Sequence, residues 1–148
     1  MQILVDADAC PRAIKQILFR AAESKQVPTV LVANQYITPP QSKFVRSQQV
    51  EQGFDKADDA IAAQLSPGDL VITADVPLAA QVIDLDATAL NPRGTLYTKE
   101  NVRDFLRRRD EAESLRDSGL ISGGPSAIDQ KVIQRFANAL DRFLARVV

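Results

Sequence analysis

Apolar and polar residues follow one another along the chain in a pattern that predicts strands separated by helices. Short apolar runs rich in β-branched residues, each typical of a buried strand, occur at residues 3–5, 29–33, 70–73 and 87–90. A weaker alternation predicts a further strand over 44–50. The segments between and after these strands carry apolar residues at helical spacing, which predicts helices over 11–25, 56–65, 77–83, 99–116 and 127–146.

Strands that alternate with helices favour a parallel sheet, because each right-handed crossover packs its helix on one face of the sheet. We therefore expect an α/β fold of three layers, α/β/α, with about five strands and helices on both faces. The 148 residues suffice for one domain with a buried core, so we expect a single domain over 1–148. The glycine-rich segment 118–126 is expected to be a loop, with helix 127–146 packed on the domain.

Composition narrows the chemistry that the chain can perform. It contains no histidine and one cysteine, Cys10. These counts exclude Ser–His and Cys–His nucleophile pairs, histidine-ligated zinc and a thiolate metal site. Cys10 is expected to be a small buried side chain, since free cysteine often behaves as a core hydrophobe. The carboxylate oxygens of aspartate and glutamate are therefore the remaining candidates for catalysis and metal binding.

Charge and hydropathy indicate which surroundings and partners to expect. The net charge is −1, so the chain lacks the excess of positive charge that is typical of nucleic-acid-binding proteins. Aromatic residues make up only 5% of the chain and tryptophan is absent, which argues against a stacking platform for single-stranded bases. We expect no leader before the first strand, and no apolar run approaches the roughly 20 residues of a membrane helix. We expect a cytoplasmic protein without a membrane partner. The number of subunits stays open, and part of the apolar stripe of the last helix could form a homodimer surface.

Acidic residues follow two of the predicted buried strands. Asp6 and Asp8 come after strand 3–5, and Asp75 comes after strand 70–73. Ligands of open α/β sheets bind outside the carboxyl ends of the strands, and adjacent strands would make these acids neighbours. Asp58 lies at the edge of the apolar stripe of helix 56–65, where an unpaired carboxylate would be costly, and Asp59 lies further towards solvent.

Carboxylates without histidine or cysteine suit Mg²⁺ or Mn²⁺, which retain several waters and need few protein oxygens. Such a site can activate water and clamp a phosphate during in-line displacement. The alternative is structural, because aspartate also caps helices and stabilises turns. Asp8, Asp55 and Asp75 all occupy positions that fit a cap or a turn, and for Asp55, ahead of helix 56–65, the cap is the favoured interpretation.

Several motifs together resemble a known family. They are VDADACP over 5–11, GFDKADD over 53–59, GDLVITAD over 68–75, and NPRG over 91–94 with Tyr97 and Thr98. The chain is similar to the YaiI/YqxD family of uncharacterised bacterial proteins, and the similarity covers nearly all of it. That resemblance implies a PIN-like fold related to nuclease domains, whose acids come from the first strand, a mid-chain helix and a later strand end.

Carried over residue by residue, the resemblance implies a site of Asp6, Asp58 or Asp59, and Asp75, with Asp8 as an additional acid. One departure concerns the fourth acid of PIN-like sites, because Asp84 and Asp86 come too far along the chain to supply it. Two basic residues are candidates for contacting substrate phosphates. These are Arg93, which follows the strand at 87–90, and Lys99, which begins the charged helix over 99–116.

The leading hypothesis is a Mg²⁺- or Mn²⁺-dependent nuclease acting on RNA rather than DNA. Asp6, Asp58 and Asp75 would hold the metal, and Asp8 or Asp59 would orient the attacking water. The first alternative is a haloacid-dehalogenase-like phosphatase with Asp6 as nucleophile and Asp8 as acid. The second is a non-catalytic module of the PIN-like fold that binds RNA or protein.

Overall fold

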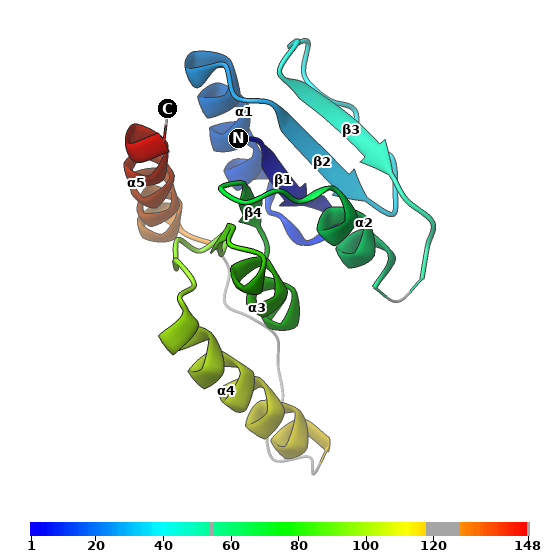
Figure 1. Cartoon of the computed structure of the whole chain (residues 1–148), viewed down its shortest axis with the longest axis vertical. Helices are drawn as coiled ribbons and strands as arrows, with labels where there is room; N and C mark the ends of the chain where they lie inside the picture. Colours follow the sequence, from blue (N-terminus) through cyan, green and yellow to red (C-terminus); the bar gives the residue numbers. More distant parts are fainter. Residues whose placement is uncertain (54, 118–127, 148) are drawn as a thin grey trace.

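A computed structural model of the chain contains one five-stranded sheet. Helices cover both faces of this sheet (Figure 1). The structure describes residues 1–53, 55–117 and 128–147, with the backbone alone for 109–117. All strand pairs are parallel, and the strand order is β3-β2-β1-β4-β5. The predicted α/β/α arrangement with five strands is therefore confirmed.

The elements follow the predicted order along the chain. The strands are β1 (Ile3–Asp6), β2 (Thr29–Ala33), β3 (Val45–Gln49), β4 (Leu70–Ile72) and β5 (Thr88–Leu90). The helices are α1 (Arg12–Lys25), α2 (Lys56–Gln64), α3 (Val76–Asp84), α4 (Lys99–Asp117) and α5 (Gln130–Val147). The bounds differ from prediction by a few residues, and the predicted loop 118–126 lies outside the described residues.

Successive residues of each central strand enter two different cores, because side chains alternate across a sheet. Ile3 and Val5 of β1 belong to the core beneath α1 and α5, while Leu4 belongs to the core beneath α2, α3 and α4. The same alternation in β4 places Leu70 and Ile72 under α1 and α5, and Val71 on the opposite face. The residues that follow these strands continue the alternation, and this decides on which face of the sheet the acids lie.

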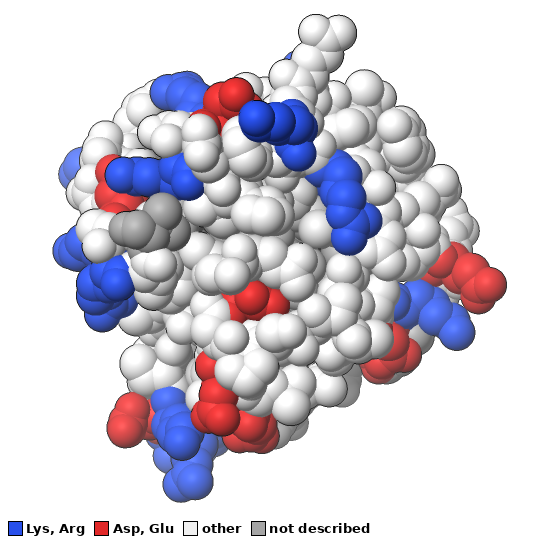
Figure 2. Space-filling model, turned by 45° about the horizontal axis from the view of Figure 1, so that its top comes forward, with Lys and Arg blue, Asp and Glu red and all other residues white. Residues whose placement is uncertain are grey.

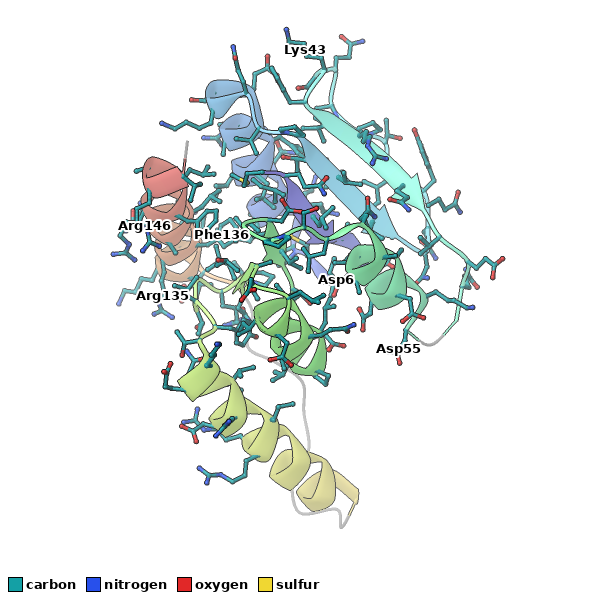
Figure 3. The ribbon with its side chains drawn as sticks, in the orientation of Figure 1. Asp6, Lys43, Asp55, Arg135, Phe136 and Arg146 are labelled. Atoms are coloured by element: carbon teal, nitrogen blue, oxygen red, sulfur yellow. The ribbon has the colours of Figure 1, made fainter. Side chains whose placement is uncertain are left out.

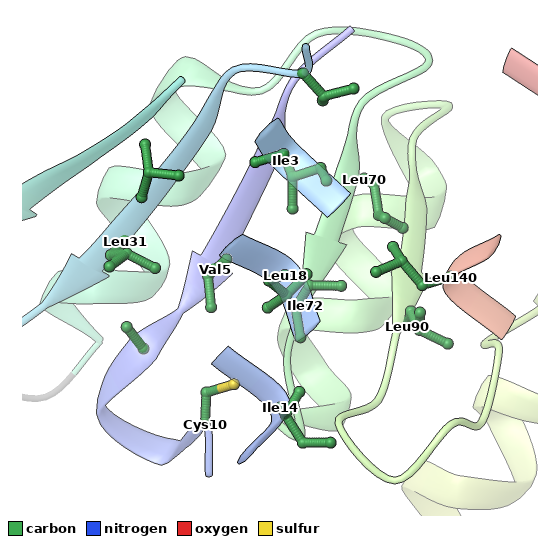
Figure 4. Packing of buried hydrophobic residues seen from close by; sticks show 14 of the residues in the cluster. Ile3, Val5, Cys10, Ile14, Leu18, Leu31, Leu70, Ile72, Leu90 and Leu140 are labelled. Atoms are coloured by element: carbon green, nitrogen blue, oxygen red, sulfur yellow. The ribbon is translucent and has the colours of Figure 1, made fainter. Parts of the chain in front are cut away.

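The first core is closed by α5, which returns across the sheet beside α1. Figure 4 shows Ile14 and Leu18 of α1 packed with the strand residues, with Leu140 of α5 at one side. Phe136 is fully buried in the same cluster. The stripe predicted for the last helix is thus largely core, although Val147 at its end is exposed.

Two local features differ from the sequence predictions. Between β1 and α1 the chain forms a short 3-10 helix, Ala7–Ala9, so Asp8 lies on a helical turn rather than in an open loop. Asp55 precedes α2 in a left-handed conformation with φ of 63°, and its side chain makes no capping hydrogen bond. The favoured capping role of Asp55 is therefore wrong, because that backbone conformation does not present its carboxylate to the first turn as an ordinary N-cap does.

No helix among the described residues is both long enough and apolar enough to cross a membrane.

Candidate functional site

The acids gather where the order of the strands reverses. The chain passes from β1 outwards through β2 to β3, and then returns to add β4 on the other side of β1. In open α/β sheets the crevice at this reversal, outside the carboxyl ends of the strands, is the usual ligand site. Asp6 ends β1, and Thr73 follows β4 directly beside it, since Val5 is paired with Ile72. The two strands are adjacent, which is the condition under which the acids that follow them were expected to be neighbours.

Asp6 and Asp75 are joined through the hydroxyl of Thr73. The alternation of side chains along β1 and β4 places Asp6 and Thr73 on the face of the sheet covered by α2 and α3. Figure 3 shows Asp6 between these helices. Thr73 Oγ1 donates a hydrogen bond to Asp6 Oδ2 at 2.9 Å and accepts one from the Asp75 backbone N–H at 3.0 Å. Thr73 is fully buried, so this link holds the two strand ends in a fixed relation.

Asp75 also caps the helix that follows it. Its Oδ1 accepts a hydrogen bond from the backbone N–H of Leu78 at 2.9 Å at the start of α3. The structural interpretation of Asp75 is thereby confirmed, and it does not compete with a role in the site. A carboxylate has two oxygens, and no described residue donates to the Oδ2 of Asp75.

Helix α2 brings Asp58 to the same place. Two adjoining clefts of about 280 and 360 Å³ are both lined by Asp55, Asp58 and Asp75, and we call them together the acidic cleft. The smaller cleft also contains Asp6 and Asp8, whereas the larger contains Asp59. All five acids proposed from the sequence therefore line the acidic cleft. Lys56 is the only basic residue that lines it among the described residues.

Burial and mutual repulsion raise the pKa of two of these acids. Burial raises the pKa of Asp6, and the charges of Asp75 and Asp8 raise it further against the lowering effect of the Thr73 hydroxyl. Burial, followed by the charges of neighbouring aspartates, raises the pKa of Asp58 from 3.8 to about 7. No described residue donates a hydrogen bond to the Asp58 carboxylate. Concentrated negative charge with so little compensation is an arrangement that a divalent cation relieves.

A different carboxylate shows what a purely structural acid looks like in this protein. Asp69 is buried just before β4, at the amino ends of the strands, where it accepts hydrogen bonds from the backbone N–H groups of Gln2 and Ser66 and from the Gln2 side chain. Its charge is compensated within the fold. Asp58 lacks such donors, which distinguishes the acidic cleft from an ordinary hydrogen-bonded turn.

The carboxylates fit a cation that keeps much of its water. Among the described residues, no three acidic or cysteine side chains converge as closely as a fully protein-bound metal would require. Mg²⁺ is commonly held by one or two carboxylates, with waters filling the other positions. Asp6, Asp58 and Asp75 fit that mode, in which some contacts pass through water.

The two predicted phosphate-binding residues lie outside the acidic cleft. Arg93 follows β5, and its backbone N–H donates to Asn91 Oδ1 at 2.7 Å. Lys99 is exposed at the start of α4. Their assignment as substrate contacts stays a prediction. Cys10 is buried as expected, and burial raises its pKa to about 12, which excludes a reactive thiolate at neutral pH.

Sequence reasoning missed Asn34 and Lys56, and it gave Thr73 no part in the proposed metal site. Asn34 directly follows β2, and its backbone N–H donates to Asp8 Oδ2 at 2.7 Å. Its position after an apolar strand run was the available clue, as it was for Asp6. Lys56 lines the cleft from the first turn of α2, but its side-chain direction depends on the loop before the helix, which no periodicity predicts.

Stability should depend on pH through Asp58. The folded protein retains a proton on this group up to about pH 7, whereas the unfolded chain releases it near 3.8, so Asp58 lowers stability progressively as pH rises between these values. The Asp58→Asn variant should therefore gain Tm relative to wild type across this window and keep a constant advantage above it. Thermal unfolding at a series of pH values measures this. Asp59→Asn, at the adjacent exposed position, should show a smaller change, and equal pH profiles for wild type and Asp58→Asn would contradict the argument.

Comparison with known proteins places this arrangement in a family. The model of the family described as "Uncharacterized BCR, YaiI/YqxD family" matches residues 4–146. A "UPF0178 protein" of Shewanella amazonensis is 58% identical over 147 residues, covering 99% of both chains. A "UPF0178 protein" of Hahella chejuensis is 57% identical over 146 residues, covering 99% of this chain and 97% of the relative. The chain belongs to the YaiI/YqxD family, as its motifs predicted. No solved structure matches it.

Proposed function

We propose that this protein is a Mg²⁺- or Mn²⁺-dependent nuclease that hydrolyses phosphodiester bonds, with RNA as the preferred substrate. The observation that carries the proposal is the acidic cleft at the reversal of strand order, which is lined by Asp6 of β1, Asp58 of α2 and Asp75, which follows β4. The same three sources of acids, first strand, mid-chain helix and later strand end, are implied by the PIN-like relationship. The preference for RNA rests on that analogy.

The chain's own groups have distinct roles in this proposal. Asp6, Asp58 and Asp75 would hold the cation, which when bound would lower the pKa of a water and offset phosphate charge. Thr73 positions Asp6 by donating to one of its oxygens. Asp8 is better fixed than Asp59 to orient the attacking water, because the Asn34 N–H holds one oxygen of Asp8 and the other is left for the cleft. Lys56, which lines the cleft, would contact a non-bridging phosphate oxygen.

One feature of the cleft favours a nuclease over the phosphatase alternative. A haloacid-dehalogenase-like enzyme would use Asp6 as a nucleophile and would need the Thr73 hydroxyl for the phosphate. Here Thr73 Oγ1 donates its one hydrogen to Asp6 and accepts from the Asp75 N–H, so it has no donor left for a phosphate oxygen.

The proposal is tested by incubating the purified protein with single-stranded RNA in Mn²⁺, in Mg²⁺ and in EDTA. We expect cleavage in the first two and none in EDTA, and no release of phosphate from a phosphomonoester. Phosphate release with a trapped aspartyl-phosphate would favour the phosphatase instead. RNA binding without cleavage in any metal would favour the non-catalytic module.

A further inference from the structure

We propose that a polar pocket beside Asp8, together with the exposed ring of Tyr36, binds a nucleobase of single-stranded RNA next to the phosphodiester that is cut. The inference rests on the proposed function, because it assigns a subsite to the same cleft. It identifies the substrate as unpaired nucleic acid, recognised through a base as well as through its phosphates.

The pocket continues directly from the acidic cleft. It has a volume of about 500 Å³ and is lined by Asp8, Asn34, Gln35 and Gln52. Asp8 and Asn34 also line the smaller part of the acidic cleft, so the two spaces share a wall. A nucleotide whose phosphate lies at the acids therefore has its neighbouring base within reach of this pocket. Asparagine and glutamine amides offer paired donors and acceptors, which is the chemistry that reads base edges.

Asn34 is fixed in place, whereas the two glutamines are open to a ligand. Asn34 donates from its backbone to Asp8, donates from Nδ2 to the Glu51 carbonyl at 2.8 Å, and accepts at its own carbonyl from the Gln49 side chain at 3.3 Å. In the part of the chain that the structure describes, the side-chain amides of Gln35 and Gln52 make no hydrogen bond. They are exposed, so their donors and acceptors are available to a base.

Tyr36 is next in sequence to a residue that lines the pocket, and its side chain is exposed to solvent. It follows Gln35 directly and is 63% exposed, which is more than any other large hydrophobic or aromatic side chain in the described residues. The loop beyond it is anchored, since the Ser47 hydroxyl donates to the Ile37 carbonyl and Ile37 packs against the core. An exposed tyrosine on an anchored loop beside a polar pocket can turn onto a base and stack with it.

The charge distribution makes such a contact necessary for affinity. Figure 2 shows basic side chains in separate groups on the face it presents, with acidic residues and uncharged surface between them. The net charge of −1 agrees with this mixture. Phosphate contacts alone usually supply nucleic-acid affinity through a broad basic surface. The chain has few aromatic residues, so a single stacking position beside the site would supply the affinity for RNA that a broad basic surface or several stacked aromatic rings supply elsewhere.

The test measures binding of a fluorescein-labelled, short single-stranded RNA of mixed sequence by anisotropy, with Ca²⁺ replacing Mg²⁺ so that binding is separated from cleavage. Tyr36→Ala should weaken binding about tenfold, because stacking on one aromatic ring contributes at that scale. Tyr36→Phe keeps the ring and should bind within about twofold of wild type. Leu85→Ala, which truncates an exposed apolar residue between α3 and β5 at the other edge of the sheet, is the control and should bind as wild type does.

Tyr36→Trp adds a direct readout, since the chain otherwise has no tryptophan. Its fluorescence should be quenched by the single-stranded RNA and much less by a duplex of the same sequence. Equal affinity of Tyr36→Ala and wild type, equal weakening by Tyr36→Phe and Tyr36→Ala, or no binding of single-stranded RNA by wild type would each overturn the inference. Metal-dependent cleavage with an unchanged KM in Tyr36→Ala would overturn it while leaving the proposed nuclease intact. Tyr36-dependent binding without cleavage would instead remove the nuclease and keep the base-binding pocket.

Discussion

Asp6→Asn is expected to lower metal-dependent RNA cleavage about 100- to 1000-fold while leaving the protein folded. Asparagine retains an oxygen that can accept the Thr73 hydroxyl hydrogen bond, so the link between β1 and the residues after β4 survives. What is lost is the negative charge that would hold the cation. Cleavage assays in Mn²⁺ and circular dichroism on the same preparation measure the two parts of this expectation.

The stability part of that prediction has a definite sign. Burial, and then the charges of Asp75 and Asp8, raise the pKa of Asp6, so its ionised form is less favourable in the folded protein than in the unfolded chain. This cost is absent at low pH and present in full above the folded-state pKa. Asp6→Asn should therefore have a Tm equal to or above that of wild type at pH 7 without metal.

Asp84→Asn is the matched control, because it removes the same charge from an exposed position at the end of α3. It should cleave RNA as wild type does. Full activity in Asp6→Asn, or an equal loss in Asp84→Asn, would show that cleavage does not depend on the acidic cleft.

Gly94→Ala is expected to have the largest effect on stability, about 3 kcal/mol of unfolding free energy. Gly94 has φ of +94°, which side chains rarely adopt, and a Cβ there would lie 2.9 Å from the backbone nitrogen of Phe136. The backbone of a helix cannot rotate out of the way as a flexible side chain can. Helix α5 would therefore have to move away from the loop after β5. Because Phe136 belongs to α5 and is fully buried in the first core, that displacement would open this core.

Gly68→Ala separates the two causes. Gly68 also has a positive φ, +88°, but a Cβ there would meet nothing within 4 Å. It should cost about 1 kcal/mol, the conformational penalty alone. Chemical denaturation of both variants measures the difference. Equal losses in the two variants would mean that the close approach of Gly94 to α5 contributes nothing to stability.

The order of elements was predictable because each strand and helix carries its own periodicity. The runs at 3–5 and 70–72 are apolar at every position, and the structure buries both between two helical layers. Because side chains alternate between the two faces of a sheet, the positions where these strands end determine that Asp6 and Thr73 lie on the same face. The convergence of Asp6 with Asp75 could be anticipated for this reason.

Other parts of the site depend on contacts between distant segments that leave no local pattern. Asn34 meets Asp8 only because β2 lies beside β1, and nothing in either segment specifies that hydrogen bond. Asp55 looked like an ordinary N-cap, yet its left-handed backbone leaves the carboxylate in the acidic cleft. The position of Arg93 after the strand at 87–90 suggested a role near the acids, but its neighbours Asn91 and Gly94 build a loop that packs on α5.

The measurement that tests the central claim most directly is a calorimetric titration of Mn²⁺ into wild type and into Asp6→Asn/Asp75→Asn. The claim is that carboxylates from β1 and from the end of β4 bind one cation together. We expect saturable binding to wild type and its loss in the double variant, with both proteins folded. Equal Mn²⁺ affinity in the two proteins would contradict the account, because it would place any bound metal outside the acidic cleft.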